Sequence, residues 1–318
     1  MDRELAREIL IRDSMTEWAV IGSRRRGRTI KKTPRKTVSK LINQIGAGAE
    51  GRSPIGQLKM GIKNQNPSKV KMGPKKNGQT MGNAALKKHV ATAEKTGVLN
   101  LSKSKLDEFP EDVMRLKGNL RSLDLTFNKL STLTPAIGDF SSMKVLVLDQ
   151  NSLSSLPHEI GKLIKLETLS VAGNKLKSLP DSLEKCVSLK QVQLQSNQLT
   201  EFPVMLCWLK HLDLLDLSAN QVTRIPREAE HLHVTELNLN QNRLDDIAPQ
   251  IARANRLKTL RVQENCLTIS GIPTAILTDS CVSTLAVEGN LFDMRQFTHL
   301  EGYDQYQERF TAVKKKLS

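Results

Sequence analysis

The sequence is poor in aromatic residues, with seven Phe, two Trp and two Tyr among its 318 residues. None of them lies within the two densest basic clusters, residues 24–28 and 31–36. Sites for single-stranded nucleic acid place aromatic side chains among the basic ones, so that bases can stack on them. The scarcity of aromatic residues therefore argues against an RNA site of that kind in the basic region.

Long apolar runs are lacking as well. No run approaches the roughly 18 apolar residues of a membrane-spanning helix, and residues 1–8 hold no apolar core of the signal-peptide type. The four cysteines form no CxxC pair, the spacing of many zinc and redox sites. We therefore expect reduced thiols in a cytosolic protein. Cys186 falls at an apolar position of the repeat described below, which predicts a small buried side chain.

Catalytic patterns are also missing. The six histidines show neither metal-ligand nor catalytic-triad spacing. No glycine-rich loop of the phosphate-binding type occurs. We therefore expect a protein that is not an enzyme and that uses no cofactor and no metal.

Positive charge is concentrated in the first quarter of the chain. Residues 1–80 hold 19 Lys and Arg against 6 Asp and Glu, so +13 of the formal net charge of +15 belongs to them. The segment has few large apolar residues to offset the entropy of ordering, and we predict a disordered basic extension over residues 1–80. Its basic clusters suit nucleic acid, a nuclear import signal or anionic lipid. A solvated tail without a dedicated partner also explains them.

From residue 120 onward the chain repeats. Asparagines recur at intervals of 23, 23, 23, 23, 22, 23 and 25 residues, and apolar residues stand five and three residues before each and two residues after it. The alternating apolar pair predicts a short strand with both side chains inward. An asparagine side chain can satisfy backbone donors and acceptors where the chain turns away. The asparagines are Asn128, Asn151, Asn174, Asn197, Asn220, Asn242, Asn265 and Asn290.

This spacing is that of the leucine-rich repeat. It predicts an α/β fold, a solenoid with a curved parallel sheet and short 3₁₀ or helical turns on its convex side. Residues 82–97 are expected to form an N-terminal cap helix, and residues 298–318 a C-terminal cap. Residues 98–297 are expected to hold the array, a partial first repeat followed by eight full ones. The last coil is 25 residues long, so a longer convex helix is expected near residues 275–278.

Binding residues are expected on the concave face, where the side chains beside the inward leucines point outward. These positions are polar, rich in amides and mildly acidic, which suits a protein surface and makes the repeats poor nucleic-acid binders. Phe127 and Arg261 are the expected anchors. The alternative is that these side chains only keep the sheet soluble. The candidates are Asp124, Phe127, Asp149, Gln193, Gln195, Asp216, Asn238, Asn240, Arg261 and Gln263.

From Met81 onward the sequence also resembles a group of small intracellular leucine-rich repeat proteins. The resemblance covers about three quarters of the chain, whereas residues 1–80 depart from it. It implies a cytoplasmic, non-enzymatic protein whose N-terminal glycine, here Gly82, is myristoylated. The stretches that carry it are Met81-Gly82-Asn83-Ala84-Ala85-Leu86, residues 236–242, Glu264-Asn265-Cys266-Leu267, residues 285–292 and residues 301–310.

The stretch that begins at Met81 is a near match to a myristoylation start, with Leu86 where Ser or Thr is usual. We expect translation to begin at Met81 in the functional protein, with Lys87, Lys88 and Lys95 assisting a lipid anchor on Gly82 at an anionic membrane. The alternative is a full-length protein in which residues 1–80 form a basic disordered tail. Two functions remain open. One is a cytoplasmic, monomeric protein-interaction scaffold that is tethered to membranes. The other is a nuclear adaptor whose basic extension contacts nucleic acid while the repeats recruit a protein.

Overall fold

The computed structural model describes residues 83–317. The predictions for residues 1–80 and for Gly82 lie outside this range. Within it, nine strands form one parallel sheet whose spatial order follows the chain. These strands are β1 (Val98–Asn100), β2 (Ser122–Asp124), β3 (Val145–Val147), β4 (Thr168–Ser170), β5 (Gln191–Gln193), β6 (Leu214–Asp216), β8 (Glu236–Asn238), β10 (Thr259–Arg261) and β11 (Thr284–Ala286).

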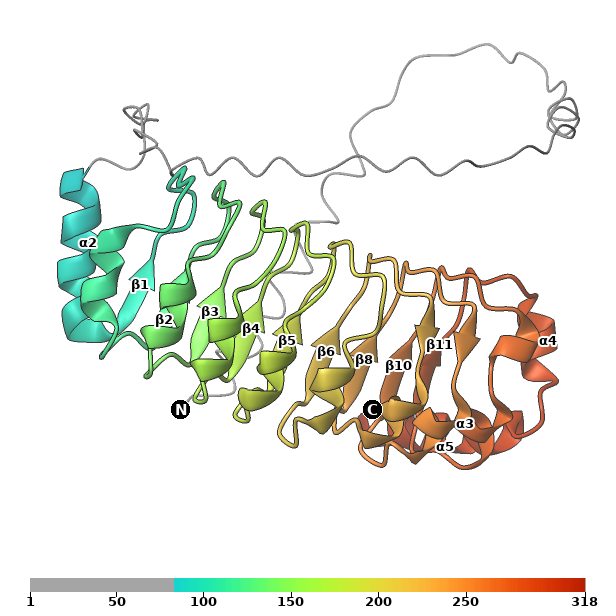
Figure 1. Ribbon diagram of the computed structural model, residues 1–318. Coiled ribbons are helices and arrows are strands. Elements are labelled where there is room, and N and C mark those ends of the chain that lie inside the picture. The colour runs from blue at the N-terminus through green and yellow to red at the C-terminus, as the bar shows by residue number, and fades with distance from the viewer. Residues whose placement is uncertain (1–82, 318) are drawn as a thin grey trace, which may run out of the picture. The chain divides into compact units, whose positions relative to one another are not determined.

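Short helical turns connect the strands on the other side of each coil (Figure 1). Eight are 3₁₀ turns, and α3 (Thr274–Thr278) lies where a longer convex helix was expected, near residues 275–278, but its five residues make it no longer than most of the 3₁₀ turns. The prediction of a leucine-rich repeat solenoid is therefore confirmed. The 3₁₀ turns are η1 (Glu111–Leu116), η2 (Pro135–Asp139), η3 (His158–Lys162), η4 (Asp181–Lys185), η5 (Val204–Trp208), η6 (Arg227–His231), η7 (Pro249–Arg253) and η8 (Ile269–Gly271).

The core lies between the sheet and these turns. The inward pair of every strand is buried, from Leu99 and Leu101 to Leu285 and Val287. Equivalent residues pair directly across neighbouring strands, as Leu123 pairs with Leu146. Each coil therefore covers the apolar side chains of the coil before it, and stability comes from the contact between neighbours.

The predicted asparagine ladder is present, and it joins coils as well as closing turns. The Nδ2 atom of Asn197 donates to the carbonyl of Leu194 in its own coil, at 3.0 Å, and to that of Val171 in the preceding coil, at 2.8 Å. Its Oδ1 atom accepts from the N–H of Leu176, at 3.0 Å. The same two amide donations recur from Asn128 to Asn290. Each asparagine thus satisfies buried backbone groups of two coils at once.

The residue before each asparagine has a positive φ. Gly173, with φ of 64°, occupies this position in one coil, and a Cβ there would lie 2.4 Å from the Nε2 atom of Gln150. Phe127, with φ of 55°, occupies it in another. The left-handed turn directs the asparagine back into the core, and it strains any residue other than glycine.

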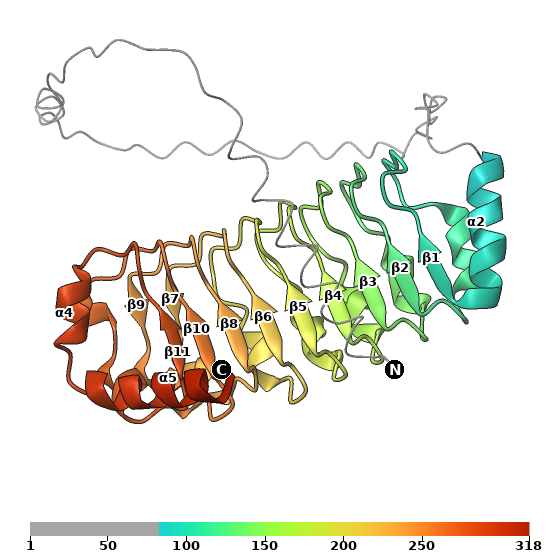
Figure 2. The same cartoon turned by 180° about the vertical axis from the view of Figure 1, so that it is seen from behind.

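Helices cover both open ends of the array (Figures 1 and 2). At the N-terminal end, α2 (Asn83–Thr96) buries Leu86, Val90 and Ala93 against the first coil. At the far end, α4 (Met294–Thr298) and α5 (Tyr303–Leu317) follow the last strand. The Tyr306 hydroxyl accepts a hydrogen bond from the N–H of Leu285, at 3.1 Å, and so occupies part of the free edge of β11.

A second sheet was not predicted. It has two strands of two residues each, β7 (Arg224–Ile225) and β9 (Asp246–Ile247). Strands this short leave no alternation for a sequence pattern to reveal.

Candidate functional site

The outward side chains of the sheet form three columns on the concave face. The second column lies between the two residues of each inward pair, and the third lies directly after the pair. These two columns contain the predicted site residues other than Phe127. The first column, which lies one residue before each inward pair, was missed, although the two-residue period of a strand places it on the same face. It contains Val98, Ser122, Val145, Thr168, Gln191, Leu214, Glu236, Thr259 and Thr284.

Several acidic and amide side chains of the second column accept a hydrogen bond from a backbone N–H at the end of their own strand. The Oδ1 atom of Asp216 accepts from the N–H of Ser218, at 2.8 Å, and also from its hydroxyl, at 2.6 Å. A side chain two residues earlier thus supplies the acceptor for an N–H at the point where the strand ends. The same contact is made by Asn100 to Ser102, Asp124 to Thr126 and Asn238 to Asn240.

Asp149 makes the equivalent contact to the next coil. Its Oδ1 atom accepts from the N–H of Ala172 and from the hydroxyl of Ser170, both at 2.7 Å. Burial raises the pKa of the Asp149 carboxyl, an effect that these hydrogen bonds oppose and that the charge of Asp124 reinforces. Asp149 is therefore a structural acceptor as well as a candidate contact.

The structure brings the remaining candidates together in small groups. Gln193 lies 3.0 Å from the Ser170 hydroxyl, within the group that contains Asp149. Asn238 donates to Asp216 at 3.2 Å. Asn240 donates to Gln263 at 3.0 Å, and Gln263 donates to Glu288 at 2.8 Å. The Oε1 atom of Gln195 is buried and has no hydrogen-bond partner among the described residues.

Arg261 is engaged with a neighbour. Its guanidinium pairs with the carboxylate of Glu236, a first-column residue of the adjacent strand. The three columns together carry five carboxylates and this one guanidinium, a net charge of −4. A face of this sign repels phosphate backbones. The carboxylates belong to Asp124, Asp149, Asp216, Glu236 and Glu288.

Phe127 differs from the other candidates. It lies in the turn directly after β2, where its side chain is 54% exposed. The ammonium of Lys103 lies 5.4 Å from the centre of its ring. Phe127 is thus a large, half-exposed aromatic residue at a backbone position that strains residues other than glycine. The equivalent residues are Lys103, Gln150, Gly173, Ser196, Ala219, Gln241, Glu264 and Gly289.

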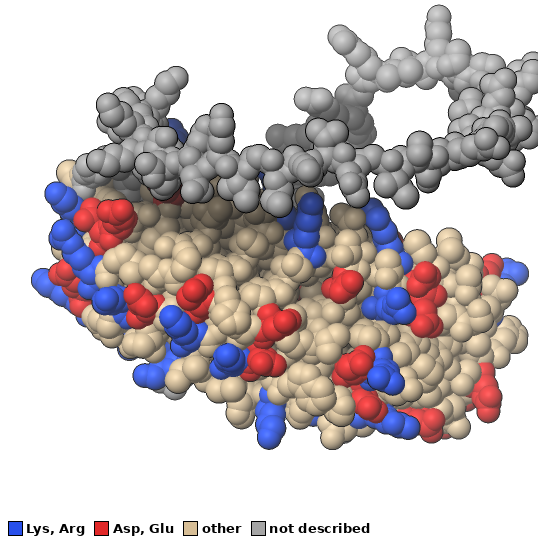
Figure 3. Space-filling view, in the orientation of Figure 1, with Lys and Arg blue, Asp and Glu red and all other residues tan. Residues whose placement is uncertain are grey.

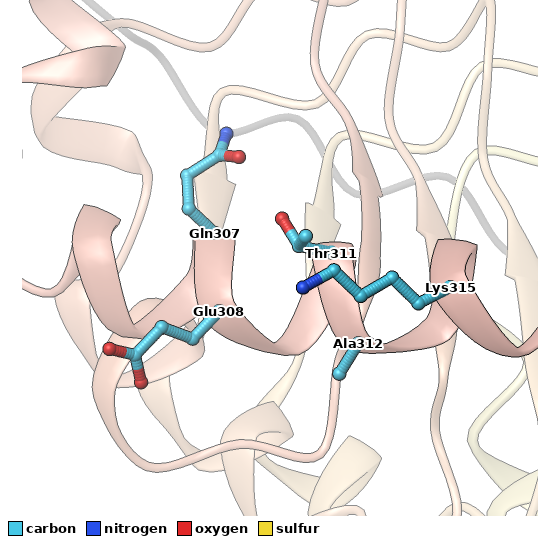
Figure 4. A pocket seen from close by; sticks show the side chains of 5 residues that line it. All are labelled: Gln307, Glu308, Thr311, Ala312 and Lys315. Carbon is cyan, nitrogen blue, oxygen red and sulfur yellow. The ribbon is translucent and has the colours of Figure 1, made fainter.

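One hollow opens beside the concave face, between α2 and β1. Its volume is about 400 Å³, and its lining includes Lys88, His89, Thr92 and Val98. Another, of about 420 Å³, is lined by Gln307, Glu308, Thr311, Ala312 and Lys315, which all belong to α5 (Figure 4). A hollow whose lining comes from a single helix is an open, shallow part of the surface. The hollow beside β1 is therefore the better candidate to receive a partner's side chain.

No metal centre or membrane span occurs in residues 83–317. These residues contain no group of three His, Cys, Asp or Glu that is arranged to hold a metal ion. None of their helices is both long enough and apolar enough to cross a bilayer. Figure 3 shows basic and acidic side chains interspersed over the visible face, without a field of one sign.

Comparison with known proteins agrees with this geometry. The family described as leucine rich repeat matches residues 118–176, 141–199 and 164–222. A leucine-rich repeat protein of Leptospira interrogans is similar over 67% of this chain and 61% of its own, with 29% identity and a TM-score of 0.56. An internalin of Listeria monocytogenes is similar over the same shares, 67% and 61%, with 19% identity and a TM-score of 0.56, and shows the fold alone.

A third solved structure is a plant receptor. It is the repeat ectodomain of the membrane receptor kinase GASSHO1/SCHENGEN3 from Arabidopsis thaliana, in complex with CASPARIAN STRIP INTEGRITY FACTOR 2. The similarity covers 62% of this chain and 25% of that one, with 29% identity and a TM-score of 0.50. The chain thus spans less than two thirds of each of these structures. The repeats, the sheet and the matches together show a leucine-rich repeat solenoid.

Proposed function

We propose that this protein is a non-enzymatic scaffold that binds a protein partner through the concave face of its repeats. The observation that carries the proposal is Phe127, an exposed aromatic ring at a strained turn beside that face. Aromatic residues are enriched among the few side chains that dominate interface energies. The amide and carboxylate groups around it supply the polar part of such an interface.

The comparisons support a binding role in general terms. The plant receptor ectodomain is in complex with CASPARIAN STRIP INTEGRITY FACTOR 2, so an array of similar fold holds a partner. Solenoids present extended concave surfaces for this purpose. The partner of the present chain is proposed to be a protein, and the scaffold is proposed to act as a monomer.

The proposed location is the cytoplasm, with a lipid tether at Gly82. The support is the resemblance from Met81 onward to leucine-rich repeat-containing protein 57, together with the near match to a myristoylation start. Mass spectrometry of the cellular protein's N-terminus tests it. Acylated Gly82 is the expected result, and an uncut peptide across residues 76–87 in the dominant species contradicts it.

A nuclear adaptor is the second candidate, favoured by the basic clusters at residues 24–28 and 31–36. A salt titration of nucleic-acid binding, with and without residues 1–80, separates the two functions. Phosphate contacts weaken steeply with salt. Salt-sensitive binding that disappears without residues 1–80 would support the adaptor.

Partner capture with matched variants tests the concave interface. The full chain and its Phe127→Ala variant are immobilised, and captured proteins are quantified by mass spectrometry. A Leu291→Ala variant is the control, because Leu291 is 66% exposed but follows the last strand. We expect Phe127→Ala to lose partners that the parent and the control retain. Identical sets in all three samples would refute the proposal.

A further inference from the structure

The acidic side chains of the concave face differ in whether a cation neutralises them. Glu236 is paired with Arg261. Three aspartates of the second and third columns form no ion pair within residues 83–317, and the hydrogen bonds that they accept come from neutral donors. Their side chains are half-buried. We call these residues the unpaired aspartates, and they are Asp124, Asp149 and Asp216.

The rims of the concave face are neutral over the central coils. One rim consists of the residues directly before the first column, and between β3 and β8 its charged members are Lys144, Glu167, Lys190 and Asp213. Glu167 pairs with Lys144 at 2.8 Å and with Lys190 at 2.7 Å. Asp213 is paired with Arg256. The other rim, the residues with positive φ, carries no charge in these coils. The central rim cations are therefore already engaged with rim acids.

The cations nearest the N-terminal end of the face are also engaged elsewhere. Arg121, on the rim beside β2, donates to the carbonyl of Thr96 at 3.0 Å. The ammonium of Lys103 lies 5.4 Å from the centre of the Phe127 ring. Lys258, the remaining cation of the first rim, belongs to the coil of β10, beyond the unpaired aspartates. No element around the unpaired aspartates thus supplies an ion pair to them within residues 83–317.

Hydrogen-bond acceptors outnumber donors at the centre of the face. The Ser170 hydroxyl lies 2.7 Å from Asp149 Oδ1 and 3.0 Å from Gln193 Oε1, and its single hydrogen can serve one of them. The Oε1 atom of Gln195, two residues after Gln193, is buried without a partner among the described residues. Burial raises the pKa of the Asp149 carboxyl, and the charge of Asp124 adds to this effect. Positively charged N–H donors would satisfy these groups.

We propose that the concave face binds a basic segment of its protein partner, with Lys or Arg side chains that pair with the unpaired aspartates. The inference rests on the concave interface proposed above and adds the charge of the partner. An ammonium or guanidinium group supplies both the positive charge and the hydrogens that the face lacks. An acidic segment would meet like charge, and a neutral one would leave the carboxylates uncompensated.

Selection from an unbiased peptide library tests the charge of the partner. The full chain is immobilised at physiological salt and exposed to phage that display random dodecapeptides. The phage are first cleared on the triple variant Asp124→Asn, Asp149→Asn, Asp216→Asn, which keeps residues 1–80 and so removes peptides that bind there. We expect the peptides that the parent then retains to contain Lys and Arg about twice as often as the unselected library. Neutral or acidic peptides, or none, would overturn the proposal.

A matched control separates a local contact from the overall charge of the protein. Affinity for a selected peptide is measured by fluorescence anisotropy, and the triple variant should bind about tenfold more weakly or worse. Asp139→Asn, Asp181→Asn and Glu184→Gln together remove as much charge from exposed positions of the convex turns. This control should bind like the parent. An equal loss in the control would contradict the proposal.

The triple variant should fold, because each asparagine keeps an oxygen that can accept the backbone N–H now bonded to the aspartate. The midpoint of urea unfolding checks this. If the triple variant is unfolded, Asp216→Asn alone is compared with Asp139→Asn, and the expected loss of affinity is about threefold. An affinity unchanged by Asp216→Asn would then overturn the proposal.

Partner capture separates this inference from the proposed function on which it rests. A partner that Phe127→Ala loses and the triple variant retains leaves the concave interface standing and overturns the basic segment. Partners that both variants retain refute both proposals. Sedimentation equilibrium detects the other occupant, a second copy of the chain. Self-association of the parent that the triple variant lacks would assign the face to that copy and overturn the proposal.

Discussion

The carboxylate of Asp149 lies 2.7 Å from the backbone nitrogen of Ala172 in the next coil and accepts its hydrogen. The two residues are 23 positions apart, one repeat period. A side chain that looks free for binding in the sequence therefore supports the stacking of coils. Substitutions on the concave face must separate these two roles.

Asp149→Asn should affect stability in a pH-dependent manner. Burial raises the pKa of this carboxyl, so the folded state binds the proton more tightly than the unfolded state. The parent protein is therefore stabilised as the pH falls through the folded-state pKa, and the carboxylate is a disadvantage at neutral pH. Asparagine keeps an acceptor for Ala172 and lacks the charge. Urea unfolding should show the largest advantage of the variant at neutral pH.

The control for that experiment is Asp149→Ala, which removes the acceptor. It should lower the free energy of unfolding by about 1–3 kcal/mol, because the N–H of Ala172 loses its partner. A benefit of Asp149→Asn that grows as the pH falls would contradict the sign of the shift.

Asn197→Ala should destabilise the array by about 1–3 kcal/mol. The substitution leaves the carbonyls of Val171 and Leu194 and the N–H of Leu176 without their side-chain partner. The midpoint of urea unfolding reports the change. Gln198→Ala is the control, since the neighbouring side chain is not part of the ladder. A midpoint as high as that of the parent would argue against the ladder's role in stability.

Phe127→Gly and Phe127→Ala should differ in stability although both remove the ring. The backbone at this position has a φ of 55°, which strains alanine and suits glycine. We expect the glycine variant to be the more stable by up to about 1 kcal/mol in thermal or urea unfolding. Both should lose the partner that depends on Phe127. If the alanine variant were the more stable, the strain at this turn would not limit stability.

The four cysteines should differ in their reaction with iodoacetamide. Burial raises the pKa of the Cys186 thiol to about 11, and burial together with the charge of Glu228 raises that of Cys207 to about 12. At pH 8 about one Cys186 in a thousand would then be the reactive thiolate. Cys266 is exposed. Peptide mass spectrometry of the native protein should find Cys266 labelled first, and early labelling of Cys186 would indicate local opening.

The fold was largely predictable because its signal is repeated. Inward residues such as Leu146 and Leu148 recur with the asparagine in phase, and the structure buries them as expected. The concave candidates were predictable only as positions. That Arg261 pairs with Glu236, 25 residues earlier, depends on rotamers across two strands that no local pattern encodes.

The sequence by itself determined the form of each coil. Each inward leucine has one position in a stacked repeat where it is buried, and each asparagine has one position where its amide satisfies buried backbone groups. The tertiary structure decided which outward side chains remain free. Stacking brings residues about 23 positions apart into contact, so Asp149 becomes an acceptor for Ala172, whereas Phe127 stays 54% exposed. Contacts of this kind follow from the packing of whole coils, which no single stretch of the chain specifies.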